Sequence, residues 1–152
     1  MTRRTRERQF AATTVIVLLT TPVVAGQFAA ENAAMRVLDT YMTALNDGDP
    51  KSVCRSFHYP YVQFAAGMVR TYETLASCQT ARETARDGRS DPHRSGWDRR
   101  TVVQAYPETV HVTVISSRFN EADQRVAQLD ALFIITRVNG RWGIRGYSQL
   151  DH

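Results

Sequence analysis

The first strong hydrophobic period in the chain has steps of three and four residues. Apolar side chains recur at these steps from Ala30 to Leu45, which predicts a helix of about four turns with one apolar face. The run ends at Asn46-Asp47-Gly48, where glycine suits the left-handed conformation that follows a helix end. We therefore expect a long helix near the start of the folded domain, packed along one side.

A short second helix is predicted directly afterwards. Asp49 is a favourable N-cap, and Pro50 suits the first helical position, where its missing N–H costs nothing. This helix would present Val53 and Phe57 to the core and would end before Pro60.

A hairpin and a third helix follow in the pattern. Residues Tyr61 to Ala66 and Met68 to Tyr72 are rich in β-branched and aromatic side chains and flank Gly67, which predicts two paired strands. The segment from Glu73 to Arg86 predicts a surface helix, because charge interrupts its apolar stripe. Asp87 to Gly96 is rich in glycine, proline and charge, and predicts a polar loop.

From Trp97 onward the hydrophobic period is two, which is typical of strands. Asn139-Gly140 lies between the last two runs and is typical of a two-residue hairpin turn. Together with the helices, this order predicts an α+β domain in which a curved antiparallel sheet packs against helices on its concave face. The expected strands are Thr101 to Tyr106, Val110 to Phe119, Arg125 to Arg137 and Arg141 to Leu150.

Residues 1–26 have the order of an export signal. An arginine-rich start precedes an apolar stretch from Phe10 to Ala25, and small residues surround a cleavage position after Ala25. The stretch is shorter than the roughly 20 apolar residues that a membrane span needs. We therefore expect a secreted or periplasmic domain over residues 27–152, with no stable membrane span. The alternative is translation from Met35, which would leave a cytoplasmic protein.

The charge of the chain is concentrated at its start. The 152 residues carry a formal charge of +4, of which residues 1–10 supply +3 through four arginines and one glutamate. The remainder is nearly neutral, and its arginines form no stripe interleaved with aromatic side chains. Nucleic-acid binding is therefore not predicted.

Cys54 and Cys78 are too few for a disulfide scaffold or a four-cysteine metal site. In an oxidising compartment they could form one bridge, and closing a loop of about 25 residues is worth roughly 3 kcal/mol. In a reducing cytosol they would be two small buried side chains. The sequence leaves both alternatives open, because it does not show whether the two Cα atoms come within bridging distance.

Three segments carry a family resemblance. The helix end from Tyr41 to Asp49 resembles the opening of the nuclear transport factor 2-like superfamily, which includes ketosteroid isomerases and SnoaL-like polyketide cyclases. Leu129 to Tyr147, with the Asn139-Gly140 turn, resembles the closing hairpin of that family. Phe57 to Val62 is similar to a SnoaL-like branch of bacterial proteins. Over residues 29–150 the resemblance implies a cystatin-like cone, with a pocket between helices and sheet and frequent dimerisation through the outer sheet face.

The resemblance makes Tyr41 a candidate catalytic residue. In ketosteroid isomerases the tyrosine at this place donates a hydrogen bond to the developing enolate oxygen. The alternative is a core tyrosine on the apolar stripe with its hydroxyl hydrogen-bonded. The carboxylate base of those isomerases falls on Ala65 when counted from Tyr41 without gaps, and no acid lies between Asp49 and Glu73. The first hairpin is therefore expected to hold no isomerase-type base.

Asp130 is the second candidate for acid–base chemistry. It lies in a hydrophobic strand and is similar to the family's late-strand aspartate, although an ungapped count from the Asn139-Gly140 turn places Ile134 there. If Asp130 faces inward, burial would raise the pKa of its carboxyl and make it a candidate acid or base. If it faces outward, it is an ordinary strand residue, and alternation alone does not decide between the two.

Three further pocket candidates lie between the second predicted helix and the first predicted strand, namely His58, Tyr59 and Tyr61. His58 could act as a base near neutral pH, or it could be a loop histidine packed beside Pro60. We expect the pocket to be lined by Tyr41, His58, Tyr59, Tyr61, Trp97 and Asp130. The four histidines lack metal-ligand spacing, and no cofactor fingerprint occurs, so neither a metal nor a cofactor is predicted.

Two function classes remain. One is an exported, non-catalytic domain that binds a small apolar or aromatic molecule, or that acts as a dimeric interaction domain. The other is a small isomerase, cyclase or epoxide-hydrolase-like enzyme that uses a pocket acid or base. The missing hairpin carboxylate favours the first class. A homodimer is expected because the strand from Val126 to Ile135 has apolar residues on both faces, and a second sheet would cover the outer set.

Overall fold

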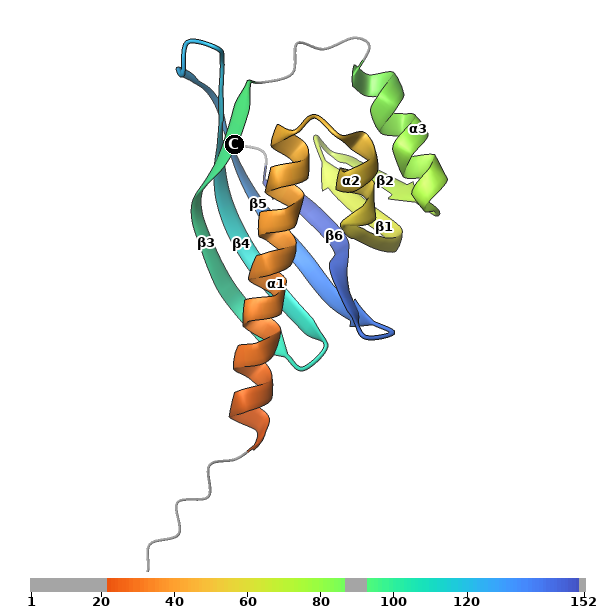
Figure 1. The fold of residues 1–152 in the computed structure, drawn as a ribbon, viewed down its shortest axis with the longest axis vertical. Helices are drawn as coiled ribbons and strands as arrows, with labels where there is room; N and C mark the ends of the chain where they lie inside the picture. The colour runs from red at the N-terminus through yellow and green to blue at the C-terminus, as the bar shows by residue number, and fades with distance from the viewer. Residues whose placement is uncertain (1–21, 87–92, 151–152) are drawn as a thin grey trace, which may run out of the picture.

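The computed structural model describes residues 22–86 and 93–150, which form three helices and six strands (Figure 1). The helices are α1 (Pro22–Asn46), α2 (Pro50–Arg55) and α3 (Leu75–Arg86). The strands are β1 (Phe57–Ala65), β2 (Met68–Tyr72), β3 (Arg94–Tyr106), β4 (Thr109–Phe119), β5 (Arg125–Val138) and β6 (Arg141–Leu150).

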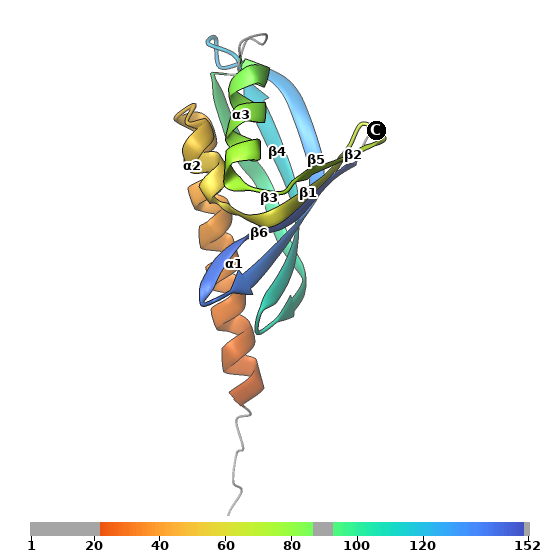
Figure 2. The same cartoon turned by 90° about the vertical axis from the view of Figure 1, so that its right-hand side faces the viewer.

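The six strands form one sheet in the order β2-β1-β6-β5-β4-β3. Neighbouring strands are antiparallel, except that β1 and β6 run parallel. The sheet curves, and α1 lies across its concave side (Figure 2). The α+β architecture predicted from the hydrophobic periods is therefore confirmed.

The long helix α1 packs a narrow face of small side chains against the sheet. Ala30, Ala34 and Leu38 are buried, and the helix contacts β3, β4, β5 and β6. α1 begins at Pro22, before the predicted cleavage position after Ala25. The predicted leader up to residue 21 lies outside the described residues.

The short helix α2 begins as its sequence predicts. The carboxylate of Asp49 accepts hydrogen bonds from the backbone N–H groups of Lys51 and Ser52, and Pro50 occupies the first helical position. The prediction that Phe57 belongs to this helix is wrong. Phe57 begins β1 and pairs with Ile144 of β6, because strand pairing over 80 residues apart prevails over the local pattern.

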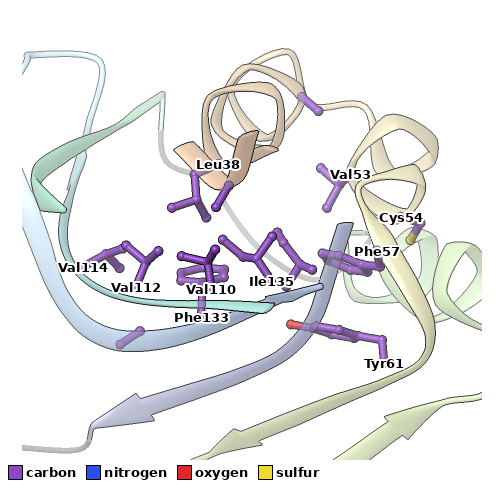
Figure 3. Close-up of a cluster of buried hydrophobic side chains, with 14 of the residues drawn as sticks. Leu38, Val53, Cys54, Phe57, Tyr61, Val110, Val112, Val114, Phe133 and Ile135 are labelled. Carbon is purple, nitrogen blue, oxygen red and sulfur yellow. The ribbon is translucent and has the colours of Figure 1, made fainter. Parts of the chain in front are cut away.

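The strands β4 and β5 supply most of the core under α1. Their inward residues alternate along each strand, and the close-up in Figure 3 shows them meeting Leu38 above the sheet. This buried set consists of Val110, Val112, Val114, Ala131, Phe133 and Ile135. The Asn139-Gly140 turn between β5 and β6 is confirmed, with positive φ values of 50° and 80° that suit a two-residue hairpin.

Strand β3 begins earlier than the sequence pattern predicts. The expected polar loop extended to Gly96, but β3 starts at Arg94, and its first residues pair with the end of β4. Residues 87–92 of that predicted loop lie outside the described residues. The strand begins here because Ser95 pairs with Arg118, a contact between residues that are distant in the sequence.

The helix α3 is attached through a disulfide bond between Cys54 of α2 and Cys78 of α3. Both cysteines are fully buried, and their Cα atoms are 6.0 Å apart. Of the two alternatives left open by the sequence, the structure contains the bridge. Among residues 75–85 of α3, Cys78 is the one buried residue and the other side chains are half-buried or exposed, consistent with a surface helix.

Candidate functional site

A small pocket lies between the C-terminal half of α1 and the concave face of the sheet. Tyr41, Met42 and Leu45 of α1 form one wall. The other walls come from four strands, with Ser95 and Trp97 from β3, Val114, Ser116 and Arg118 from β4, Leu129, Ala131 and Phe133 from β5, and Tyr147 from β6.

Tyr41 is the centre of an aromatic cluster in this pocket. Its ring centroid is 5.7 Å from that of Phe133, 6.0 Å from that of Phe57 and 6.5 Å from that of Trp97. The ring of Tyr147 also packs edge-on against Phe133, with centroids 5.1 Å apart. These distances are in the range of favourable aromatic packing, so the rings themselves fill much of the space between helix and sheet.

The remaining space has a cavity volume of about 40 Å³ and is partly open to solvent. A cavity that holds benzene in another protein measures about 150 Å³. The pocket of this chain therefore accommodates a few water molecules or the head group of a small molecule, and it is too small for a polycyclic substrate.

The polar groups of the pocket gather where β3 and β4 pair. Ser95 is paired with Arg118, and Trp97 is paired with Ser116, so four polar side chains form one block on the inner face of the sheet. The indole Nε1–H of Trp97 is buried and has no hydrogen-bond partner among the described residues. The lining residues include no Asp, Glu or His side chain.

Asp130 lies on the other face of the sheet. Its neighbours Leu129 and Ala131 both line the pocket, and side chains alternate along a strand, so the carboxylate of Asp130 points to the outer face. Alternation along the sequence did not show which face of the sheet carries Asp130. The residues that line the pocket show that it is the outer face. Tyr41 and Asp130 therefore do not line the pocket together.

His58 does not line the pocket. It is buried on the outer face of the sheet, where β1 lies beside β6. Its Nδ1 lies 3.0 Å from the hydroxyl of Thr136, and its ring covers Gly143, the residue that pairs with Thr136. Burial, followed by the positive charges of Arg141 and Arg145, lowers the pKa of His58 to about 4. A neutral imidazole packed in this way is a structural residue and is not positioned for chemistry in the pocket.

The two arginines beside His58 have a structural explanation. The register of β1 against β6 shifts between Phe57 and Val62, which interrupts the backbone ladder. The Arg141 guanidinium donates to the carbonyl of Phe57 at 2.8 Å, and the Arg145 guanidinium donates to the carbonyl of Tyr59 at 3.0 Å. The side chains thus satisfy acceptors that the shifted ladder leaves available.

Tyr59 and Tyr61 make structural contacts within the fold and do not line the pocket. The hydroxyl of Tyr59 donates to the carbonyl of Cys54 at 2.7 Å. Tyr61 stacks on Phe57 with ring centroids 4.0 Å apart, and burial raises the pKa of its hydroxyl above the usual range. Of the six predicted pocket residues, the structure places Tyr41 and Trp97 in the pocket lining and places the other four elsewhere.

Most of the pocket residues that the sequence did not predict lie on β4 and β5, and the others are Met42, Leu45, Ser95 and Tyr147. Val114, Ser116 and Arg118 share one face through simple alternation, which is visible in the sequence. Their relevance depends on the pairing of β3 with β4, which the sequence does not show.

Two further observations concern the described residues alone. They contain no group of three or more His, Cys, Asp or Glu side chains that could hold a metal ion. None of the described helices is both long enough and apolar enough to span a membrane.

Comparison with known proteins agrees with the fold. The chain matches the profile of the family described as NTF2-like protein (DUF6841) over residues 30–151. A comparison with curated protein sequences gives no match.

Solved structures share the fold at low sequence identity. An NTF2-like protein of unknown function from Pseudomonas putida KT2440 superimposes with a TM-score of 0.67 at 15% identity, covering 80% of this chain and 86% of that one. A protein of unknown function with a cystatin-like fold from Nostoc punctiforme gives a TM-score of 0.66 at 11% identity, covering 78% and 88%. An NTF2-like protein from Shewanella oneidensis MR-1 gives 0.64 at 11% identity, covering 80% and 98%.

Proposed function

The chain belongs to the NTF2-like family described as DUF6841, and from this premise we propose that it is a non-catalytic binding domain whose pocket holds a small molecule or its head group. The observation that carries the proposal is the composition of the pocket. Aromatic rings fill it, about 40 Å³ remain, and its lining residues include no carboxylate or imidazole that could serve as a base.

The sequence left an isomerase, cyclase or epoxide-hydrolase-like enzyme as the alternative. An isomerase needs a group that takes a proton from carbon and returns it, and general acid–base help is worth roughly 10²–10⁴ in rate. Tyr41 could stabilise an enolate, but Ala65, Asp130 and His58 are not among the residues that line the pocket. We therefore place binding ahead of catalysis, and we expect no isomerisation of unsaturated ketones above background.

Binding can be followed through Trp97, which lies in the pocket wall. Replacing Trp142, the other tryptophan, by phenylalanine leaves Trp97 as the one indole fluorophore. We expect propionate or propionamide to change this fluorescence in the millimolar range, and Ala131→Leu, which fills the pocket, to abolish the response. Circular dichroism would show that the variants are folded. Absence of a response to both probes would overturn the proposed function.

Self-association through the outer sheet face forms a second part of the proposal. The strand pairing places one residue from each of four neighbouring strands in a row on this face. The row consists of Val69 of β2, Phe64 of β1, Ser148 of β6 and Leu132 of β5. Phe64 and Val69 are 46% and 64% exposed. A second copy of this face would cover the row, as large exposed apolar patches commonly mark interfaces.

The matched test uses two exposed phenylalanines. Phe64→Glu places a charge in the row on the sheet, whereas Phe28→Glu places a charge on α1, away from it. We expect sedimentation at micromolar concentration to give a dimer for the unaltered protein and for Phe28→Glu, and a monomer for Phe64→Glu. A monomeric unaltered protein would refute this part of the proposal.

Export is the third part. The predicted signal over residues 1–26 and the disulfide between Cys54 and Cys78 support an oxidising destination, secreted or periplasmic, because such bridges are rare in a reducing cytosol. N-terminal sequencing of the mature protein should begin near Gly26 or Gln27. A start at Met1 or Met35 would contradict this expectation.

A further inference from the structure

The pocket has a polar corner and an apolar side. The corner consists of Ser95, Trp97, Ser116 and Arg118, brought together by the pairing of Ser95 with Arg118 and of Trp97 with Ser116. The apolar side consists of Met42, Leu45, Leu129 and Ala131. Such an arrangement suits a ligand with a polar head and a short apolar tail.

Within residues 22–86 and 93–150, no ion pair balances the positive charge of Arg118 in this corner. Arg94 forms an ion pair with Asp123 and Arg100 forms one with Asp39, and neither of these pairs between described residues engages Arg118. The pocket lining contains no acidic side chain. Arg118 is half-buried, and a half-buried arginine in an aromatic pocket whose lining residues include no carboxylate favours an anionic partner.

The hydrogen-bonding groups point to the same ligand. Arg118 carries donors alone, and the hydroxyls of Ser95 and Ser116 can donate as well. An oxygen-rich head group meets these donors better than an amine or an alkyl group.

We propose that the pocket binds a small monocarboxylate, with its head group on Arg118 and the β3–β4 serines and its short alkyl tail against Leu129 and Ala131. This inference rests on the proposed binding function and names its ligand class. The cavity volume of about 40 Å³ limits the buried part of the ligand, head group and tail together, to a few non-hydrogen atoms.

The test compares propionate with propionamide, which has nearly the same shape and no charge. Titrations follow Trp97 fluorescence in the Trp142→Phe protein. We expect propionate to bind at least about tenfold more tightly than propionamide, since a hydrogen bond to a charged group is about twice as strong as a neutral one. Arg118→Gln should remove this preference, and Arg118→Lys should retain part of it. Arg125→Gln, which alters an exposed arginine at the start of β5, should leave it unchanged.

The outcomes separate the ligand class from the binding function. Equal binding of the two probes, with both responses lost in Ala131→Leu, would overturn the monocarboxylate assignment and leave the binding pocket standing. A preference for propionate that survives Arg118→Gln would also overturn the assignment. If neither probe binds, both the monocarboxylate assignment and the proposed binding function are overturned.

Discussion

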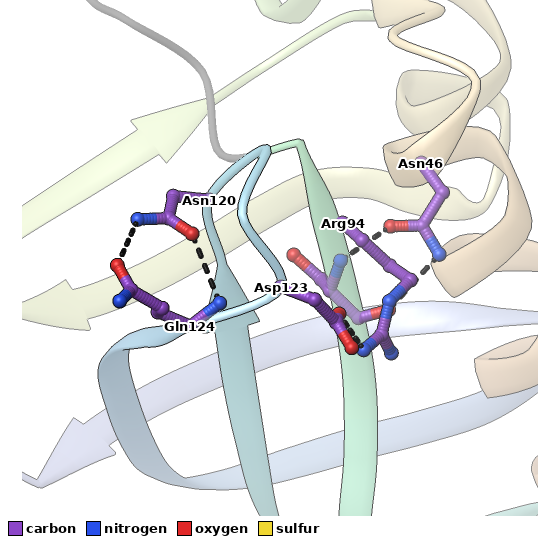
Figure 4. A network of polar contacts seen from close by, with 6 residues as sticks. Asn46, Arg94, Asn120, Asp123 and Gln124 are labelled. Carbon is purple, nitrogen blue, oxygen red and sulfur yellow. Dashed lines mark hydrogen bonds and ion pairs between the residues drawn. The ribbon is translucent and has the colours of Figure 1, made fainter.

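Asn46 and Ser95 form two hydrogen bonds that join the end of α1 to the start of β3. The Asn46 side-chain amide donates to the Ser95 carbonyl at 3.0 Å, and the Ser95 backbone N–H donates to the Asn46 side-chain oxygen at 2.7 Å (Figure 4). Asn46 is the last residue of α1, and Ser95 is the second residue of β3. The pair therefore fixes the helix end that carries Tyr41 against the strand that carries Trp97.

Replacing Asn46 by alanine should loosen this connection. Ser95 is buried, so its backbone N–H and carbonyl would lose their partners at a cost of about 1–3 kcal/mol in the free energy of unfolding. Urea denaturation measures the loss. Thr43→Ala, which changes an exposed residue in the same last turns of α1, is the control and should shift the stability by less than about 0.5 kcal/mol. Equal effects of the two substitutions would contradict the role given to Asn46.

The disulfide should determine how firmly α3 is held. Cys78 is the buried residue of that helix, and the bridge spans 24 residues of sequence. A chain in which Cys54 and Cys78 are both alanine should lose roughly 3 kcal/mol of stability, according to the loop-entropy account. Amide hydrogen exchange should accelerate across α3 before it does so in β4 and β5. Uniform acceleration over the whole chain would show that α3 is not held separately.

His58 should make the protein sensitive to mild acid. Its pKa is lowered from about 6.5 in the unfolded chain to about 4 in the folded protein, so the folded state binds its proton less readily. The stability contributed by the neutral ring is complete above pH 6.5 and falls as the pH drops from 6.5 to 4. We expect a loss on the order of 1–2 kcal/mol, allowing for screening by solvent.

The pH effect can be assigned to this residue with a matched pair. His58→Gln should flatten the dependence of unfolding free energy on pH between 7 and 4, whereas His93→Gln, at an exposed position, should leave it unchanged. If His58→Gln retains the full slope, other groups are responsible for it.

Gly143 should be intolerant of a side chain because the ring of His58 occupies its space. A Cβ atom at this position would lie 3.0 Å from the Cδ2 and Nε2 atoms of His58. Gly143→Ala should therefore cost about 1–3 kcal/mol in unfolding free energy. In a His58→Ala background the same substitution should cost much less, because the obstructing ring is gone. Additive costs in the double variant would refute the contact as the cause.

The parts of the fold that were predictable depend on local signals. The α1 stripe, the cap at Asp49 and the Asn139-Gly140 turn are each determined within a few residues, and each is confirmed. The start of β3 and the inclusion of Phe57 in β1 were missed, because each depends on pairing with a distant strand.

The candidate site shows the same division. Tyr41 was identifiable from the helix pattern and the family resemblance, and it lines the pocket. Arg118 could not be recognised as another pocket residue before the β3–β4 register was known. Asp130 and His58 carry chemically suggestive side chains, but the register turns both toward the outer face.

The most direct test of the binding account is an NMR measurement on propionate bound to the unaltered protein. Intermolecular nuclear Overhauser effects from the methyl and methylene protons should reach the side chains of Leu129 and Ala131 and the rings of Tyr41 and Trp97, because these residues line the pocket. The account predicts these contacts and their loss in Ala131→Leu. Contacts to Phe64 on the outer face, or no contacts to the pocket residues at saturating propionate, would contradict it.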